Sequence, residues 1–160
     1  MNEQLIAWLN DAYAMEQGLI PVLQKHASNA QHTMPAAAAR MQQHIAETNT
    51  HAARVEQCLR VLGATPSTAK STLSQMLGTV QGITTGISRD APVRNTLADY
   101  SAEQLEVACY RALVTAARQL GHEEIAQLCE LNMREDEAMA LWFRDQIPEV
   151  VTTTMRNNQV

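Results

Sequence analysis

The stretch YSAEQLEVACYRALVTAARQLG, residues 100–121, shows most directly which structure this chain adopts. Apolar and carboxylate side chains recur in it at intervals of three and four residues, which is the period of one face of an α-helix. The residues of that face are Glu103, Glu106, Tyr110, Leu113, Ala117 and Leu120. Gly121 follows, and glycine commonly ends a helix. The stretch therefore belongs to a predicted helix from about Val93 to Leu120, whose core face carries two glutamates.

Three further segments have the same period. We expect helices from about Glu3 to Ala30, from Pro35 to about Leu62, and from about His122 to Gln146, before Pro148. Residues 64–92 are rich in Ser, Thr and Gly, so they predict a long crossover that contains one short helix. Residues 149–160 are expected to form a loosely ordered tail.

Composition and loop lengths together predict the fold. The 160 residues are 46% hydrophobic and only 4% aromatic, a mixture more typical of helices than of strands. Short loops join the first two helices and the last two, so each pair should form an antiparallel hairpin. One long crossover between two such hairpins predicts an all-α, ferritin-like four-helix bundle, a single domain over residues 1–148.

Charge and cysteine content exclude several classes of protein. The net charge is -5 and basic residues do not cluster, which argues against a nucleic-acid partner. The sequence has no stretch of about 18 apolar residues, so we expect no membrane span, and its first residues do not resemble a signal peptide. Cys58, Cys109 and Cys129 lie in apolar-periodic segments and are expected to be buried free thiols. We therefore expect a reducing compartment, the cytoplasm.

Carboxylates lie on the expected core face of every helix. They are Glu16, Glu47, Glu103, Glu106 and Glu135. Glu16 and Glu47 are 31 residues apart and Glu106 and Glu135 are 29 apart, so short-looped hairpins would place them at similar heights. Buried carboxylates at close range repel one another unless a cation neutralises them. The pattern therefore predicts a metal site, with Glu103 as the weakest of the candidates.

Histidines extend this metal-site prediction. His44 lies three residues before Glu47 and His51 four residues after it, so both share its helical face. Either ring could bind a metal or support a ligand, and His44 is the preferred candidate. A carboxylate-rich set with one or two imidazoles suits two iron or manganese ions better than zinc. His26, near a helix end, is expected to lie in solvent.

Four segments of the sequence resemble one family. They are WLNDAYAMEQ (residues 8–17), QHIAETNTHAARVE (43–56), the stretch at 100–121 and MREDEAMALW (133–142). They are similar to the YciE/YciF-type bacterial stress proteins, a ferritin-like family, and most of all to the YciE branch. The resemblance implies a homodimer and a metal site like that of rubrerythrins. Thr50 and Ala138 stand where ferritin-like di-iron sites usually carry histidines, which is a departure from that pattern.

Two functions compete on this evidence. The first is a cytoplasmic, stress-related protein with a di-iron or di-manganese centre that carries out rubrerythrin-like redox chemistry on peroxide or oxygen. Because the sequence has no Cys-x-x-Cys pair, electrons would come from a separate donor protein. The second is a non-catalytic, dimeric interaction protein whose acidic site is vestigial or empty.

Overall fold

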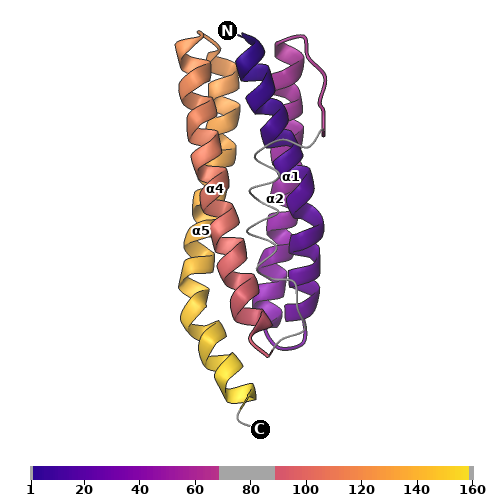
Figure 1. Ribbon diagram of the computed structural model, residues 1–160, viewed down its shortest axis with the longest axis vertical. Coiled ribbons are helices and arrows are strands. Elements are labelled where there is room, and N and C mark those ends of the chain that lie inside the picture. Colours follow the sequence, from indigo (N-terminus) through magenta and orange to yellow (C-terminus); the bar gives the residue numbers. More distant parts are fainter. Residues whose placement is uncertain (1, 69–88, 159–160) are drawn as a thin grey trace.

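The computed structural model describes residues 2–68 and 89–158. In these ranges the chain forms four long helices that run side by side (Figure 1). They are α1 (Asn2–Ala30), α2 (Pro35–Val61), α4 (Ala91–Gln119) and α5 (Glu123–Asn157). The predicted all-α four-helix bundle is confirmed.

Proline and glycine set the ends of α2 and α4. Pro35 opens α2, where the missing N–H of proline breaks no helical hydrogen bond. Gly63 and Gly121 follow the ends of α2 and α4 with φ angles of 71° and 77°. This left-handed conformation favours glycine because a Cβ atom would be strained there. Both predicted helix stops are confirmed.

Helix α5 is longer than its sequence pattern indicated. The helix was expected to end before Pro148, but it passes through that proline and ends at Asn157. A proline inside a helix removes a hydrogen bond and costs about 3 kcal/mol. Val150 and Thr154 lie in the extension and are buried, which offsets part of that cost. This corrects the predicted end of the last helix, and most of the predicted loose tail is helical instead.

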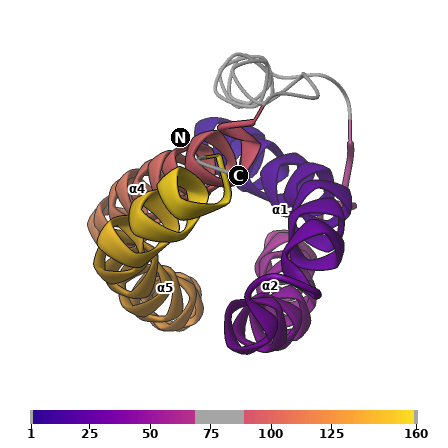
Figure 2. The ribbon, with the colours of Figure 1, turned by 90° about the horizontal axis from the view of Figure 1, so that it is seen from below.

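The helices pair as two hairpins. Helix α1 packs on α2 and α4 packs on α5, and the hairpins meet through α1 with α4 and α2 with α5 (Figure 2). Helix α2 ends at the end of the bundle where α1 begins, whereas α4 begins at the opposite end (Figure 1). The predicted crossover would have to join these two ends. Its centre, residues 69–88, lies outside the described residues, and so does nearly all of the short helix predicted from Thr68 to about Gly86.

The apolar interior forms two clusters. The first apolar cluster includes Leu5, Leu9, Met15, Val55, Leu59, Leu113, Ile125 and Cys129. The second apolar cluster is Leu23, Ala27, Ala37, Met41, Ile45, Met139 and Phe143. Between them, α2 contributes buried His44, Thr48 and His51, and α5 contributes Asn132 and Asp136. A polar layer therefore divides the core of the bundle.

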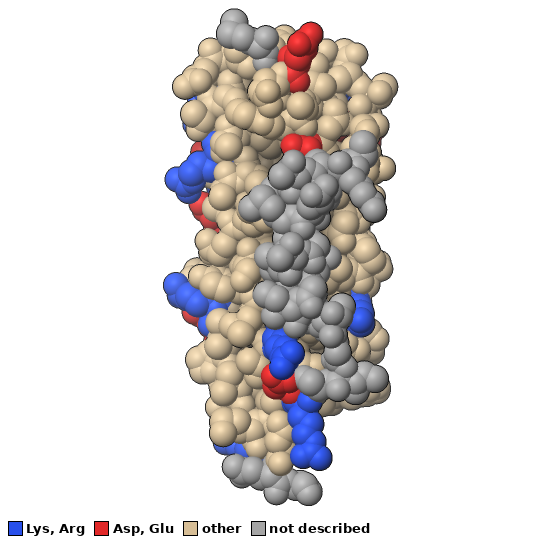
Figure 3. Space-filling view, viewed as in Figure 1, with Lys and Arg blue, Asp and Glu red and all other residues tan. Residues whose placement is uncertain are grey.

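Three further observations concern the surface charges, the apolarity of the helices and the thiols. On the face shown in Figure 3, basic and acidic side chains lie next to one another. Among the described residues, none of the helices combines the length and the apolarity needed to cross a bilayer. Cys58, Cys109 and Cys129 are free thiols, as predicted, and Cys109 is half-buried while the other two are buried.

Candidate metal centre

All four helices contribute ionisable side chains to the polar layer. Each of these side chains is at most 2% exposed: Glu16, His44, His51, Glu103, Glu106 and Asp136. His44 and His51 are seven residues apart, which is two turns of α2, so both rings point to the same side of that helix. Glu103 and Glu106 share one face of α4 for the same reason. Helical periodicity thus brings six titratable groups into one buried layer.

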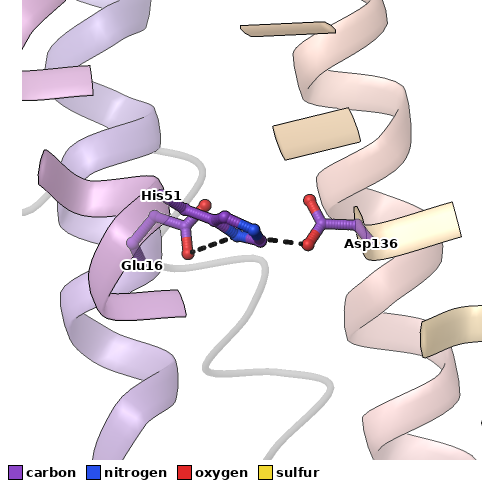
Figure 4. Close-up of side chains that lie close together, drawn as sticks. All are labelled: Glu16, His51 and Asp136. Carbon is purple, nitrogen blue, oxygen red and sulfur yellow. Dashed lines mark ion pairs between the residues drawn. The ribbon is translucent and has the colours of Figure 1, made fainter. Parts of the chain in front are cut away.

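One set of three ligands gathers around His51. Its Nδ1 atom lies 3.6 Å from Glu16 Oε2 and 3.3 Å from Asp136 Oδ1 (Figure 4). The three residues come from α1, α2 and α5, so the set forms only when the two hairpins pack together. One ligand atom from each lies within 4.8 Å of the others. That spacing would allow one ion to contact all three.

A second set gathers around His44. Its Nε2 atom lies 2.9 Å from Glu103 Oε1. His44, Glu103 and Asp136 also offer ligand atoms within 4.8 Å of one another. Asp136 belongs to both sets, and a carboxylate has two oxygens to share. The layer therefore has the composition of a two-ion site with one common carboxylate.

Several ligand atoms in the layer have no hydrogen-bond partner within the described residues. They are Glu16 Oε2, His51 Nδ1, Glu103 Oε2 and both carboxylate oxygens of Asp136. Leaving such a buried atom unpaired costs roughly 1–3 kcal/mol. All five atoms belong to the two ligand sets, and a cation would satisfy them together.

Three carboxyl groups of the layer, those of Asp136, Glu106 and Glu103, resist ionisation when no cation is present. Burial raises the pKa of Asp136 well above its ordinary value, and the charges of Glu16 and Glu103 raise it further. Burial and the charges of Asp136 and Glu16 likewise raise the pKa of Glu106. Burial also raises the pKa of Glu103, although His44 opposes this. The layer would thus exchange protons for metal charge.

Carboxylates on the outer side of the histidines orient both rings. His44 Nδ1 bonds to Glu47 Oε2 at 2.8 Å, and His51 Nε2 bonds to Glu135 Oε2 at 2.7 Å. If each of these nitrogens donates its proton to the carboxylate, Nε2 of His44 and Nδ1 of His51 keep their lone pairs toward the layer. The two rings would therefore be opposite tautomers.

Arginines keep the outer carboxylates ionised. Arg54 donates to both oxygens of Glu135, at 2.7 and 3.2 Å, and Arg40 donates to Glu47 at 3.3 Å. Burial alone would raise the pKa of Glu135, but hydrogen bonds from Arg54 and His51 outweigh it and lower that pKa. The pKa of Glu47 is lowered in the same way, by His44 and Arg40 against burial. An ionised carboxylate is the stronger acceptor for a histidine N–H.

Tyr110 and Asn132 orient Glu16. The Tyr110 hydroxyl donates to Glu16 Oε1, and Asn132 Nδ2 donates to the same hydroxyl at 2.9 Å. Asn132 Oδ1 accepts from Arg54 at 2.9 Å. This chain of bonds occupies one oxygen of Glu16 and leaves Oε2 facing His51 and Asp136.

The structure separates the six residues that the sequence singled out as metal ligands. Glu16, His44, Glu103 and Glu106 lie inside the layer. The other two lie on its outer side, where the side chain of Glu47 is 24% exposed and that of Glu135 is 35% exposed.

Sequence reasoning preferred His44 to His51, whereas the structure places one of these rings in each ligand set, and it missed Asp136. The expected core stripe of the last helix runs through Ile125, Leu128, Leu131, Glu135, Ala138 and Trp142. Ile125 is fully buried as expected, but Leu131 is 45% exposed whereas Asp136 is fully buried, so the middle of that stripe is wrong by about one residue. The alternative stripe Cys129, Asn132, Asp136, Met139 and Phe143 has the same three-and-four spacing. Asn132 and Asp136 are polar residues on this otherwise apolar stripe, and they were the signal in the sequence that a polar group is buried there.

Comparisons with known proteins agree with this architecture. Residues 1–156 match the family described as a domain of unknown function, DUF892. A protein of known structure from Xanthomonas campestris pv. campestris is 32% identical, with a TM-score of 0.83 over 99% of this chain and 97% of the other.

Two more distant structures share the fold alone. YcfI from Rhodopseudomonas palustris is 24% identical, with a TM-score of 0.80 over 90% of this chain and 92% of the other. The E. coli stress protein YciF is 22% identical, with a TM-score of 0.78 over 94% of this chain and 96% of the other. The chain therefore belongs to the DUF892 family and has a YciF-like, ferritin-like fold.

Proposed function

We propose that the polar layer binds two divalent metal ions, iron or manganese, and that the metal-loaded protein carries out redox chemistry on peroxide or oxygen. One ion would bind Glu16, His51 and Asp136, and the other His44, Glu103 and Asp136. The observation that supports this most is the set of five buried ligand atoms that have no partner within residues 2–68 and 89–158, all of which belong to these two groups.

The donor set favours these metals. Each group offers two carboxylates and one imidazole and no thiolate, a combination that suits iron and manganese better than copper or structural zinc. Glu106 is buried, and the charges of Asp136 and Glu16 act on it. Its carboxylate would be available to either ion.

The chain's own residues would prepare the site for binding. Glu47 and Glu135 fix the ring tautomers, Tyr110 fixes one oxygen of Glu16, and the two apolar clusters limit the access of water. The bound ions would supply the electrons for the reaction with peroxide or oxygen. A separate protein would return them, since the sequence has no second iron site of the Cys-x-x-Cys kind.

Three finer assignments complete the proposal. YciF is described as a stress protein, and we extend a stress-related role to this chain. The four segments quoted above favour the YciE branch of the family and a homodimer. Light scattering on the purified protein would show twice the 17.7 kDa chain mass if the dimer exists.

Elemental analysis tests metal binding. Full-length protein made in iron-supplemented cells should contain close to two metal ions per chain, and Asp136→Asn should lose most of them because both ligand sets share this residue. Asp145→Asn is the matched control, since Asp145 is an exposed aspartate on the same helix. Wild-type protein without metal, or Asp136→Asn with full occupancy, would contradict the proposal.

Peroxide consumption tests the redox part separately. The reduced, metal-loaded protein should consume peroxide in proportion to its metal content, and Asp136→Asn should consume correspondingly less. Two bound ions without any peroxide or oxygen consumption would leave a structural metal centre and refute the redox function.

The alternative is an interaction protein with an empty acidic layer. The raised pKa values of Asp136, Glu103 and Glu106 favour it, because carboxyl groups that stay protonated need no cation. In that case no metal would copurify, and Asp136→Asn would raise the melting temperature without changing any metal content.

A further inference from the structure

A cavity of about 170 Å³ lies at the end of the bundle where α4 begins. All four helices contribute to its wall, beyond the second apolar cluster as seen from the metal layer. Asp99 lines the cavity and precedes Glu103 by four residues on α4, which is a rise of about 6 Å. The cavity is therefore separate from the two ligand sets but only about one helical turn from them.

Most of the cavity wall is apolar. Met34, Met41, Trp142 and Phe143 line it, and the two aromatic rings meet edge to face with centroids 5.1 Å apart. Methionine sulfur makes favourable contacts with aromatic rings and adapts to their shape. A dry apolar cavity of about 150 Å³ is large enough to bind benzene. Size and lining together favour a single aromatic ring.

One edge of the cavity is polar and deeply buried. His26 Nδ1 lies 2.8 Å from Asp99 Oδ1 and 3.0 Å from Oδ2, and both residues are at most 5% exposed. The sequence placed His26 in solvent, and this is wrong. Its partner comes from another helix 73 positions away, so the local pattern gave no sign of the pair. The pair therefore places a polar edge beside the apolar side chains that line the rest of the cavity.

The unused polar atom is His26 Nε2. If Nδ1 donates its proton to the Asp99 carboxylate, Nε2 is left as an acceptor. Among the described residues, no hydrogen bond engages this nitrogen, and His26 lines the cavity. A ligand that fills the cavity can therefore satisfy it by donating one hydrogen bond.

We propose that this cavity is a binding site for a small phenol-class molecule, whose ring lies among Met34, Met41 and Trp142 and whose hydroxyl donates to His26 Nε2. The site requires no metal ion. Phenol binding can therefore be tested on metal-free protein. A negative result would refute this proposal without bearing on the proposed metal site.

Phenol itself is the probe. In metal-free, full-length protein with isotope-labelled methionine methyl groups, phenol should shift the signals of Met34 and Met41. Met15 lies in the first apolar cluster, and its signal should not move. Anisole has the same ring but no donor, so it should bind about three- to tenfold more weakly, the value of one hydrogen bond. Unchanged Met34 and Met41 signals would refute the site, and equal affinity for anisole would refute recognition of the hydroxyl.

A pair of alanine variants tests the location of the site. Ala37 is buried in the cavity wall, so Ala37→Leu should fill the space and weaken phenol binding at least tenfold. Ala53→Leu places the same side chain on an exposed position of α2 and should bind phenol as the wild type does. Unchanged binding by Ala37→Leu would overturn the proposal. Should Ala37→Leu fail to fold, the comparison of phenol with anisole on the wild type decides.

Discussion

The same four helices build the first apolar cluster and the polar layer. The contribution of each region to the stability of the fold, however, depends on different conditions. In the first apolar cluster, residues such as Leu9 and Ile125 are fully buried. Their burial stabilises the fold whatever the solution contains. In the polar layer, five buried atoms lack partners in the described part of the chain, and three carboxyl groups have raised pKa values.

This difference indicates a division of labour within one bundle. The apolar clusters supply enough stability to keep the ligand groups together before any ion arrives. Under the proposed function, the polar layer would lower stability in the metal-free protein, and a bound cation would raise it by replacing the protons that keep the buried carboxyl groups neutral. Stability and metal binding can therefore be perturbed separately.

Leu9→Ala should have the largest effect on stability. Leu9 is fully buried in the first apolar cluster, and such truncations cost about 2–5 kcal/mol because they leave a cavity. Urea unfolding of the metal-free protein measures this. Leu97→Ala removes a leucine that is 45% exposed on α4 and should cost about 0.5 kcal/mol or less. Similar losses in the two variants would show that this cluster does not carry the stability of the bundle.

Metal addition should produce the next largest change. At roughly ten times the dissociation constant of each of the two sites, Fe²⁺ or Mn²⁺ should raise the free energy of unfolding by about 2.8 kcal/mol. Asp136→Asn should lose this increment because both ligand sets need the carboxylate. Urea unfolding with and without metal gives the comparison. An increment that survives in Asp136→Asn would place the bound metal elsewhere.

Arg54→Ala should weaken metal binding by about 10- to 100-fold, equivalent to about 1.4–2.7 kcal/mol. Arg54 does not belong to either ligand set, but it holds Glu135 against His51 and thereby orients the ring. Calorimetric titration with Mn²⁺ measures the affinity. Arg111→Ala is the matched control, because it breaks the exposed pair of Arg111 with Glu137 and should leave the affinity unchanged. Equal affinities in the two variants would show that Arg54 does not support metal binding.

The pH dependence of the metal-free protein should be the smallest of these effects. The pKa values of Asp136 and Glu106 are raised in the folded state, so their contribution to stability is complete below the ordinary carboxyl range and is lost as pH rises through the folded-state values. Between about pH 5 and about pH 8 the melting temperature should therefore fall by about 2–4 °C. Thermal melts in the presence of a chelator measure this.

Two outer carboxylates should act in the opposite direction at lower pH. The pKa values of Glu47 and Glu135 are lowered, so their stabilisation is present above the ordinary glutamate value of 4.5 and is lost as pH falls below it. Asp136→Asn should flatten only the decline on the alkaline side. The melts cover about pH 5 to about pH 8. A melting temperature that rises steadily over this range would show that ionisation of the buried carboxyl groups does not destabilise the fold.

Local periodicity accounts for what was predictable about the site. The positions of Glu16, Glu103 and Glu106 on core faces follow from residues three and four apart on their own helices. The adjacent pair Glu135 and Asp136 shows where such reasoning stops. Both stripes through α5 have helical spacing, and a rotation of about 100° about the helix axis decides which carboxylate is buried.

The sequence by itself determined the four helices, their glycine stops and the presence of carboxylates along the core, because these depend on spacing and on backbone preferences within one segment. Only the tertiary structure decided that His51 meets Asp136, that Arg54 reaches Glu135, and that His26 pairs with Asp99. Each of those contacts joins one hairpin to the other. Their geometry depends on how the helices rotate and slide as apolar side chains pack, and no single helix carries that information.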